Sequence, residues 1–144
     1  MNKDSKNSRA LTIANFLVKQ GVSRSEAMRR AWGTVKQRVI HTNTAGVTHG
    51  NRQALLYRLT QYSADLISVT LRREPENAAG KNAVQVIAAV KGKGSAVMGY
   101  LNRQLAEAIA PLLDKGKQVL AKFEAVTGGA EAFLNYGLNV GISV

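Results

Sequence analysis

Cationic side chains are the residues whose chemistry stands out in this sequence, because lysine and arginine outnumber aspartate and glutamate by 20 to 9. The net charge of +11 concentrates phosphate-bearing partners near the protein. A merely solubilising surface is the alternative, but the charge slightly exceeds what solubility needs. We therefore expect a nucleic acid as partner, ahead of an acidic protein surface and a membrane. The cations that we expect to contact it are Arg52, Arg72, Arg73, Lys81, Lys91, Lys93 and Arg103, with Arg29 and Arg30 nearer the N-terminus.

Ring-bearing side chains supply the second half of this chemistry. Tyr100, His49 and Phe133 could each stack on a base, which contributes roughly 1–3 kcal/mol in such sites. Some of the cations could instead have no nucleic-acid contact. Arg72 and Arg73 could pair with the neighbouring acids Glu74 and Glu76, and Lys91 and Lys93 could simply lie in an exposed turn. Both alternatives stay open at the level of sequence.

Catalytic residues are poorly represented. The chain has no cysteine, and its two histidines, His41 and His49, lie in a loop-like stretch without an obvious carboxylate cluster. The run Gly92-Lys93-Gly94-Ser95 lacks the full phosphate-loop pattern and its strand-loop-helix setting, which favours a hairpin turn. We expect a binding module and no enzyme, with neither a metal nor another cofactor.

The start of the chain and its hydropathy indicate a compartment. Residues 1–9 are polar and charged, unlike a signal peptide. No apolar run approaches the roughly 18 residues that span a bilayer. We expect a cytoplasmic protein.

Two helices are predicted in a basic segment, residues 1–40, which has nine basic and two acidic side chains. Apolar residues recur at helical spacing over 8–20, and Gly21 ends the pattern. Ser23 and Glu26 have the spacing of a capping box for a second helix. We expect Met28 and Trp32 of that helix to pack against the first, and both helices to pack on the domain that follows.

Short strands and two further helices are predicted after residue 40. Asn51 could cap the helix at 51–60, and Pro111 should end or kink the helix at 102–113. Many short strands with one substantial helix favour an α+β fold or a small barrel. The predicted strands are 66–71, 83–87, 97–99, 119–126 and 138–144.

Four motifs occur in an order typical of one family: GVTHGNRQ at 46–53, LRREPENAAGKNAVQV at 71–86, MGYLNRQLAEAIAPLLDKGK at 98–117 and VTGG at 126–129. In these, residues 44–144 resemble the HIRAN domain, found in a helicase-like transcription factor and as stand-alone proteins of bacteria and phages. The resemblance implies a small OB-like HIRAN β-barrel with one main helix, here preceded by the basic two-helix segment. It also implies DNA binding, in the best-known member at single-stranded 3′ ends.

The family's end-binding residues are only partly kept. The resemblance places its first-strand arginine and two aromatics on Thr48, His49 and Gly50, and its Tyr-Asp pair on Ala79 and Gly80. The Gly-aromatic-Leu step survives around Tyr100, followed by a basic residue at Arg103, and Phe133 or Tyr136 would supply a late aromatic. We therefore expect DNA binding, more than RNA binding, to single-stranded, end-containing or junction-containing substrates. We also expect weak selection for a 3′ end.

A second function from a different class stays open. The basic segment and the incomplete pocket would also suit a mobile-element protein that binds a larger host nucleic-acid enzyme and inhibits or tethers it. Titration with bare single- and double-stranded DNA and RNA separates the two hypotheses.

Overall fold

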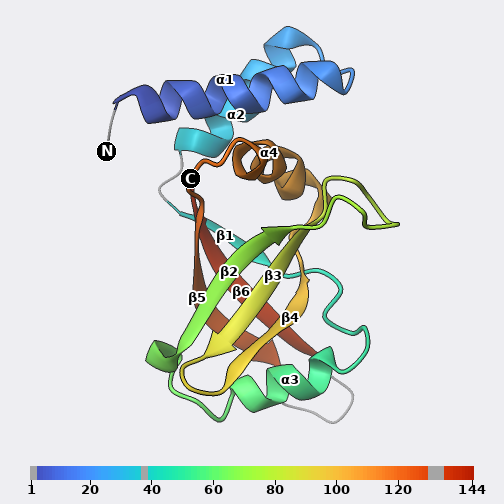
Figure 1. The fold of residues 1–144 in the computed structure, drawn as a ribbon, viewed down its shortest axis with the longest axis vertical. Helices are drawn as coiled ribbons and strands as arrows, with labels where there is room; N and C mark the ends of the chain where they lie inside the picture. The colour runs from blue at the N-terminus through green and yellow to red at the C-terminus, as the bar shows by residue number, and fades with distance from the viewer. Residues whose placement is uncertain (1–2, 37–38, 130–134) are drawn as a thin grey trace.

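Six antiparallel strands form one sheet in the order β1-β6-β5-β2-β3-β4 (Figure 1). The structure is a computed structural model that describes residues 3–36, 39–129 and 135–144. Its elements are α1 (Lys3–Lys19), α2 (Arg24–Lys36), β1 (Ile40–Asn43), α3 (Arg52–Leu59), the 3₁₀ turn η1 (Ala64–Leu66), β2 (Ile67–Arg73), β3 (Val84–Val90), β4 (Gly94–Tyr100), α4 (Arg103–Asp114), β5 (Leu120–Gly128) and β6 (Tyr136–Ser143).

The sheet curls but is not closed into a barrel among the described residues, so the α+β prediction is confirmed and the predicted barrel is wrong. The OB-like fold stays a prediction. Among the described residues no ladder joins β1 to β4, the two edge strands. A single bridge, Ala45 with Tyr100, links the chain beyond β1 to the end of β4. Because β1 has only four residues, it ends before a ladder can form. The ladder between β2 and β5 is also short, because it consists of the single residue pair Val69 and Ala121.

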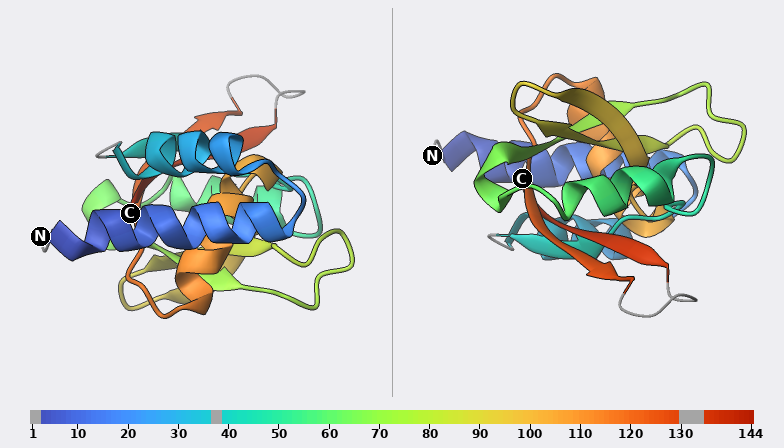
Figure 2. Two further views of the ribbon diagram at one scale, coloured as in Figure 1. Left: turned by 90° about the horizontal axis from the view of Figure 1, so that it is seen from above. Right: turned by 90° about the horizontal axis from the view of Figure 1, so that it is seen from below.

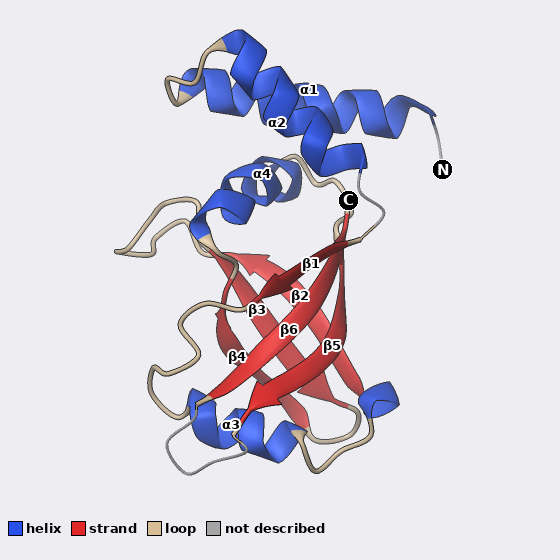
Figure 3. Cartoon of the chain, turned by 180° about the vertical axis from the view of Figure 1, so that it is seen from behind, coloured by secondary structure: helices blue, strands red, loops and turns tan. Residues whose placement is uncertain are grey.

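The main core lies within the curled sheet, with α4 at one end and α3 at the opposite end (Figure 3). The alternation predicted near the C-terminus is confirmed, because Leu138, Val140 and Ile142 of β6 are all fully buried. From the helices, Leu56 and Ile109 are fully buried in the same core. The prediction of one main helix is wrong, since α3 and α4 both cover the sheet.

The helix ends differ from the predictions in two places. Asn51 makes no side-chain capping bond with any described residue, whereas Asn102 caps α4 by accepting a hydrogen bond from the Leu105 backbone at 2.8 Å. Pro111 lies inside α4, which continues for three more residues to Asp114.

The helices α1 and α2 form a hairpin that packs on α4 (Figure 2). Half of the predicted capping box is present, because the Glu26 amide donates to Ser23 Oγ at 3.4 Å while the Glu26 carboxylate pairs with Arg29 and Arg30. Met28 and Trp32 are partly buried against the second core, which confirms their predicted packing, and α4 contributes Leu112 to that core. The boundary between residues 1–40 and 44–144 as separable units stays a prediction.

Polar bonds also fix this hairpin to the segment after α4. Arg9 is largely buried and donates from Nη1 to the Gln118 carbonyl at 2.6 Å, and Lys117 Nζ donates to Ser8 Oγ at 2.6 Å. The basic hairpin is therefore held in a defined position relative to the sheet.

Candidate nucleic-acid interface

A cavity of about 760 Å³ opens beside the last residue of β4 and the first turn of α4. We call it the main cavity. The loop 44–51 and the loop 74–83 form its other walls. It gathers five of the predicted contact residues from two loops, α3, β4 and α4: His49, Arg52, Lys81, Tyr100 and Arg103.

Tyr100 is positioned by the step that precedes α4. The backbone of Tyr100 exchanges two hydrogen bonds with Ala45, at 2.7 and 2.9 Å. Gly99 permits this approach, because a Cβ at that position would collide with the Ala45 carbonyl oxygen. The guanidinium of Arg52 lies 5.4 Å from the centroid of the Tyr100 ring and donates to the Gly46 carbonyl at 2.7 Å. Together these contacts hold a half-buried ring at the cavity wall.

Glu74 anchors the hydroxyl end of the same ring. The Tyr100 hydroxyl donates to Glu74 Oε2 at 2.7 Å, and Asn77 Nδ2 donates to the same oxygen at 2.5 Å. These two hydrogen bonds, that of Asn77 first, hold the pKa of Glu74 below its ordinary value of 4.5. Glu74 is therefore a fixed carboxylate that orients Tyr100.

Arg73 holds the loop 74–83 in place. Its guanidinium donates to the carbonyls of Lys81 and Ala83, at 3.0 and 2.8 Å, and pairs with Asp114 at the end of α4 at 2.9 Å. The alternative pairing of Arg73 with Glu74 or Glu76 is wrong. Because Arg73 is only 17% exposed and fully engaged, it is a positioning residue for the cavity wall.

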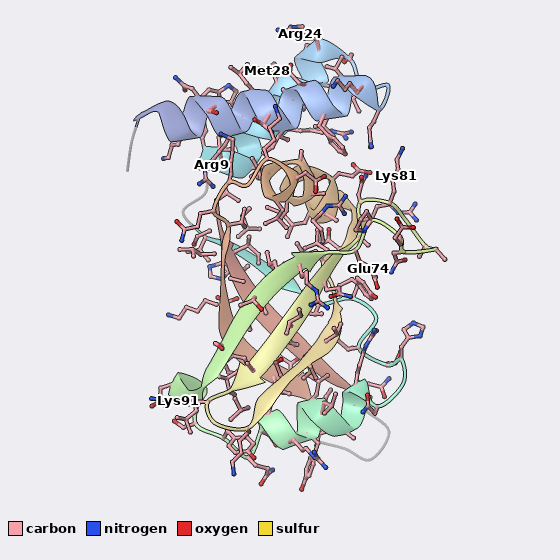
Figure 4. The ribbon with its side chains drawn as sticks, in the orientation of Figure 1. Arg9, Arg24, Met28, Glu74, Lys81 and Lys91 are labelled. Atoms are coloured by element: carbon pink, nitrogen blue, oxygen red, sulfur yellow. The ribbon has the colours of Figure 1, made fainter. Side chains whose placement is uncertain are left out.

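The other predicted cations lie outside the main cavity. Arg72 donates to Gln85 Oε1 at 3.1 Å rather than pairing with an acid. On α2, Arg29 and Arg30 both pair with Glu26. Lys91 and Lys93 are exposed in the turn between β3 and β4, and Figure 4 shows Lys91 far from Lys81 and Glu74.

The late aromatic of the family has two candidates in this chain. Phe133 lies outside the described residues. Tyr136 packs its ring 6.0 Å from that of Tyr57 and does not line the main cavity in the described part of the chain. The family's first-strand trio falls on residues 48–50, which lie in the loop after β1 and not on a strand. Of these three residues, His49 lines the main cavity.

Sequence reasoning missed Glu107, a carboxylate in the wall of the main cavity. It lies one turn beyond Arg103 on the same face of α4, and this spacing was the available signal. The Glu107 side chain makes no hydrogen bond or ion pair with any residue in the described ranges. It gives the basic cavity one negative wall.

Metal clusters and membrane spans are both missing from the described residues. No group of three or more His, Cys, Asp or Glu residues among them could hold a metal ion. Within those same ranges, no helix has both the length and the apolar character that crossing a membrane requires.

An aromatic ring beside several cations is an arrangement that suits a phosphate-bearing strand, because the cations can contact phosphates while the ring stacks on a base. The sequence comparison agrees with this geometry. The chain belongs to the HIRAN domain family, whose sequence model matches residues 39–144. HIRAN domains are generally nucleic-acid-binding modules.

One solved bacterial structure shows a distant likeness to the chain. The crystal structure of a protein from Lactobacillus plantarum is 20% identical, with 74% of this chain and 97% of that chain covered and a TM-score of 0.43. No curated protein matches the chain.

Proposed function

We propose that this protein binds single-stranded DNA in the main cavity and catalyses no reaction on it. The observation that carries the proposal is the convergence of His49, Arg52, Lys81, Tyr100 and Arg103 on one cavity. Arg103 and Lys81 are exposed and free to contact phosphates, while Tyr100 offers a fixed ring to a base.

A single strand suits this site better than a duplex. The ring of Tyr100 is half-buried in a cavity wall, so a base must leave its own stack to reach it. The family resemblance supports DNA as the nucleic acid. The second hypothesis, a protein that tethers or inhibits a nucleic-acid enzyme, stays a prediction.

Fluorescence anisotropy with labelled single-stranded DNA, duplex DNA and single-stranded RNA tests this proposal. We expect single-stranded DNA to bind most tightly, with about four to six phosphate contacts and a steep loss of affinity with salt. Lys81→Ala and Arg103→Ala should each weaken binding, whereas Lys122→Ala, an exposed lysine on β5, should not. A complex that is insensitive to salt, or equal affinity in all four proteins, would contradict the proposal. Because we propose that the protein catalyses no reaction on the strand, the oligonucleotide recovered after incubation should be intact.

A further inference from the structure

A second cavity, of about 430 Å³, adjoins the main cavity and shares His49 and Arg52 with it. It lies between the edge strand β4 and the N-terminal half of α3. We call it the β4–α3 groove. Its other lining residues are Gly50, Asn51, Leu55, Ala96 and Val97.

Cations continue beyond this groove toward the far end of the sheet. On α3, Arg52, Leu55 and Arg58 follow one another at three-residue spacing and so share one side of the helix. Arg58 is exposed, and Lys93 is exposed directly before the first residue of β4. Cations therefore lie at both ends of the β4–α3 groove, Arg52 and Arg103 at one and Arg58 and Lys93 at the other.

Two other cavities share lining residues with the main cavity, and both carry acids. The cavity between β1, α2 and α4 meets the main cavity at Glu107, and its Arg30 is already paired with Glu26. The cavity beside β1 includes Glu124, which is hydrogen-bonded to His41 at 2.5 Å. None of the described residues that line the β4–α3 groove is acidic. A phosphate backbone leaving the main cavity meets the least repulsion along this groove.

We infer that a single strand of nucleic acid held in the main cavity continues along the β4–α3 groove and ends its contact at Arg58 and Lys93. This inference rests on the proposed function and adds the route and the length of the binding site. The seven residues of β4 span about 20 Å at ~3.3 Å per residue. That length corresponds to roughly six nucleotides at the stacked spacing of about 3.4 Å. In this arrangement Lys93, which lies far from the main cavity, contacts a phosphate at the far end of the groove.

The test measures affinity against length for oligothymidylates of 3, 6, 9 and 12 nucleotides. The wild type should gain affinity up to nine nucleotides and little beyond. The double variant Arg58→Ala/Lys93→Ala should bind the 3-mer as the wild type does. At 0.1 M salt it should bind the 9-mer about 25-fold more weakly, since each phosphate contact on a single strand contributes about fivefold through counterion release. For the 9-mer, the slope of log K against log salt should become shallower by about 1.4.

The matched control is Lys115→Ala/Lys122→Ala, which removes two exposed charges, one directly after α4 and one on β5, away from the groove. It should leave the length dependence unchanged. An equal loss in the control, or an equal loss on the 3-mer, would show diffuse electrostatics and overturn the route. Loss of the length dependence in Arg30→Ala instead would place the strand along α2 and also overturn it. Both double variants should melt at the wild-type temperature, because the substituted side chains are exposed.

Failure of the route and failure of the proposed function give different results. If every length binds equally and no groove variant matters, the main cavity remains the site and the route is wrong. If no oligonucleotide of any length binds, the proposed function is wrong and the route falls with it.

Discussion

Tyr100 provides the sharpest test of the site, because its ring and its hydroxyl have separable roles. The ring lies beside Arg52 at the cavity wall, while the hydroxyl donates to Glu74. Tyr100→Ala removes the ring. We expect it to lose about 1–3 kcal/mol of stacking on a base, which is roughly a 5- to 150-fold rise in Kd.

Tyr100→Phe keeps the ring and removes the hydrogen bond to Glu74. Because Glu74 retains its bond from Asn77, we expect the loop 74–83 to stay in place and the Kd to stay within about threefold of the wild type. Its melting temperature should fall slightly. Anisotropy with a short oligothymidylate gives the affinity, and circular dichroism gives the melting temperature.

Tyr57→Ala is the matched control, since Tyr57 is 53% exposed and faces Tyr136 away from the main cavity. It should bind as the wild type does. Wild-type affinity in Tyr100→Ala, with the fold intact, would refute the stacking argument. Equal losses in the Phe and Ala variants would show that the hydroxyl, and not the ring, makes the contact.

Three further predictions follow from the same structure. Deleting residues 1–38 should leave a domain that folds but melts at a lower temperature, because Leu112 loses burial that contributes about 1.5–3 kcal/mol. The domain should also bind more weakly to every sequence. A truncated chain that does not fold would show that α1 and α2 belong to one core with the sheet. The wild type should discriminate less than tenfold between a 3′-hydroxyl and a 3′-phosphate in a competition assay, and a strong preference would mean that other residues recognise the end. Gly80→Asp should raise this preference, because a Cβ at that position meets no atom within 4 Å, whereas Gly50→Tyr should destabilise the loop because Gly50 has a φ of +57°. Because the pKa of Glu74 is lowered in the folded protein, the stabilising effect of its carboxylate is present above the ordinary pKa of 4.5 and is lost as the pH falls through the lower folded value. Thermal melts from pH 7 to pH 3 should therefore show a smaller loss of stability in Glu74→Gln than in the wild type. Identical losses in the two proteins would refute this.

Local patterns in the sequence were sufficient for most helices and strands. Ser23 caps α2 through the Glu26 amide, a contact that acts within one turn, and the alternation of Leu138, Val140 and Ile142 indicates which side of β6 is buried. The open edge of the sheet could not be predicted from local patterns. It goes with the short length of β1 and the absence of a ladder between β1 and β4 among the described residues.

The sequence predicted which types of residue form the candidate site, but less well which individual residues line it. The motif around Tyr100 located one wall of the main cavity from sequence. The bond from Arg73 to Asp114 joins residues 41 positions apart, so no local pattern could separate a positioning arginine from a phosphate-binding one. The far position of Lys93 likewise follows from the direction of β4 and not from its neighbours in sequence.

Photo-crosslinking tests the central claim most directly. A single-stranded oligodeoxynucleotide with 5-iodouracil at successive positions is irradiated with the full-length protein, and the crosslinked peptides are identified by mass spectrometry. We expect crosslinks at Tyr100 and His49, which lie on different walls of the main cavity, and these crosslinks should disappear under competition by unlabelled single strand. Crosslinks confined to α1 and α2, with none in residues 44–52 or 98–103, would contradict binding in the main cavity.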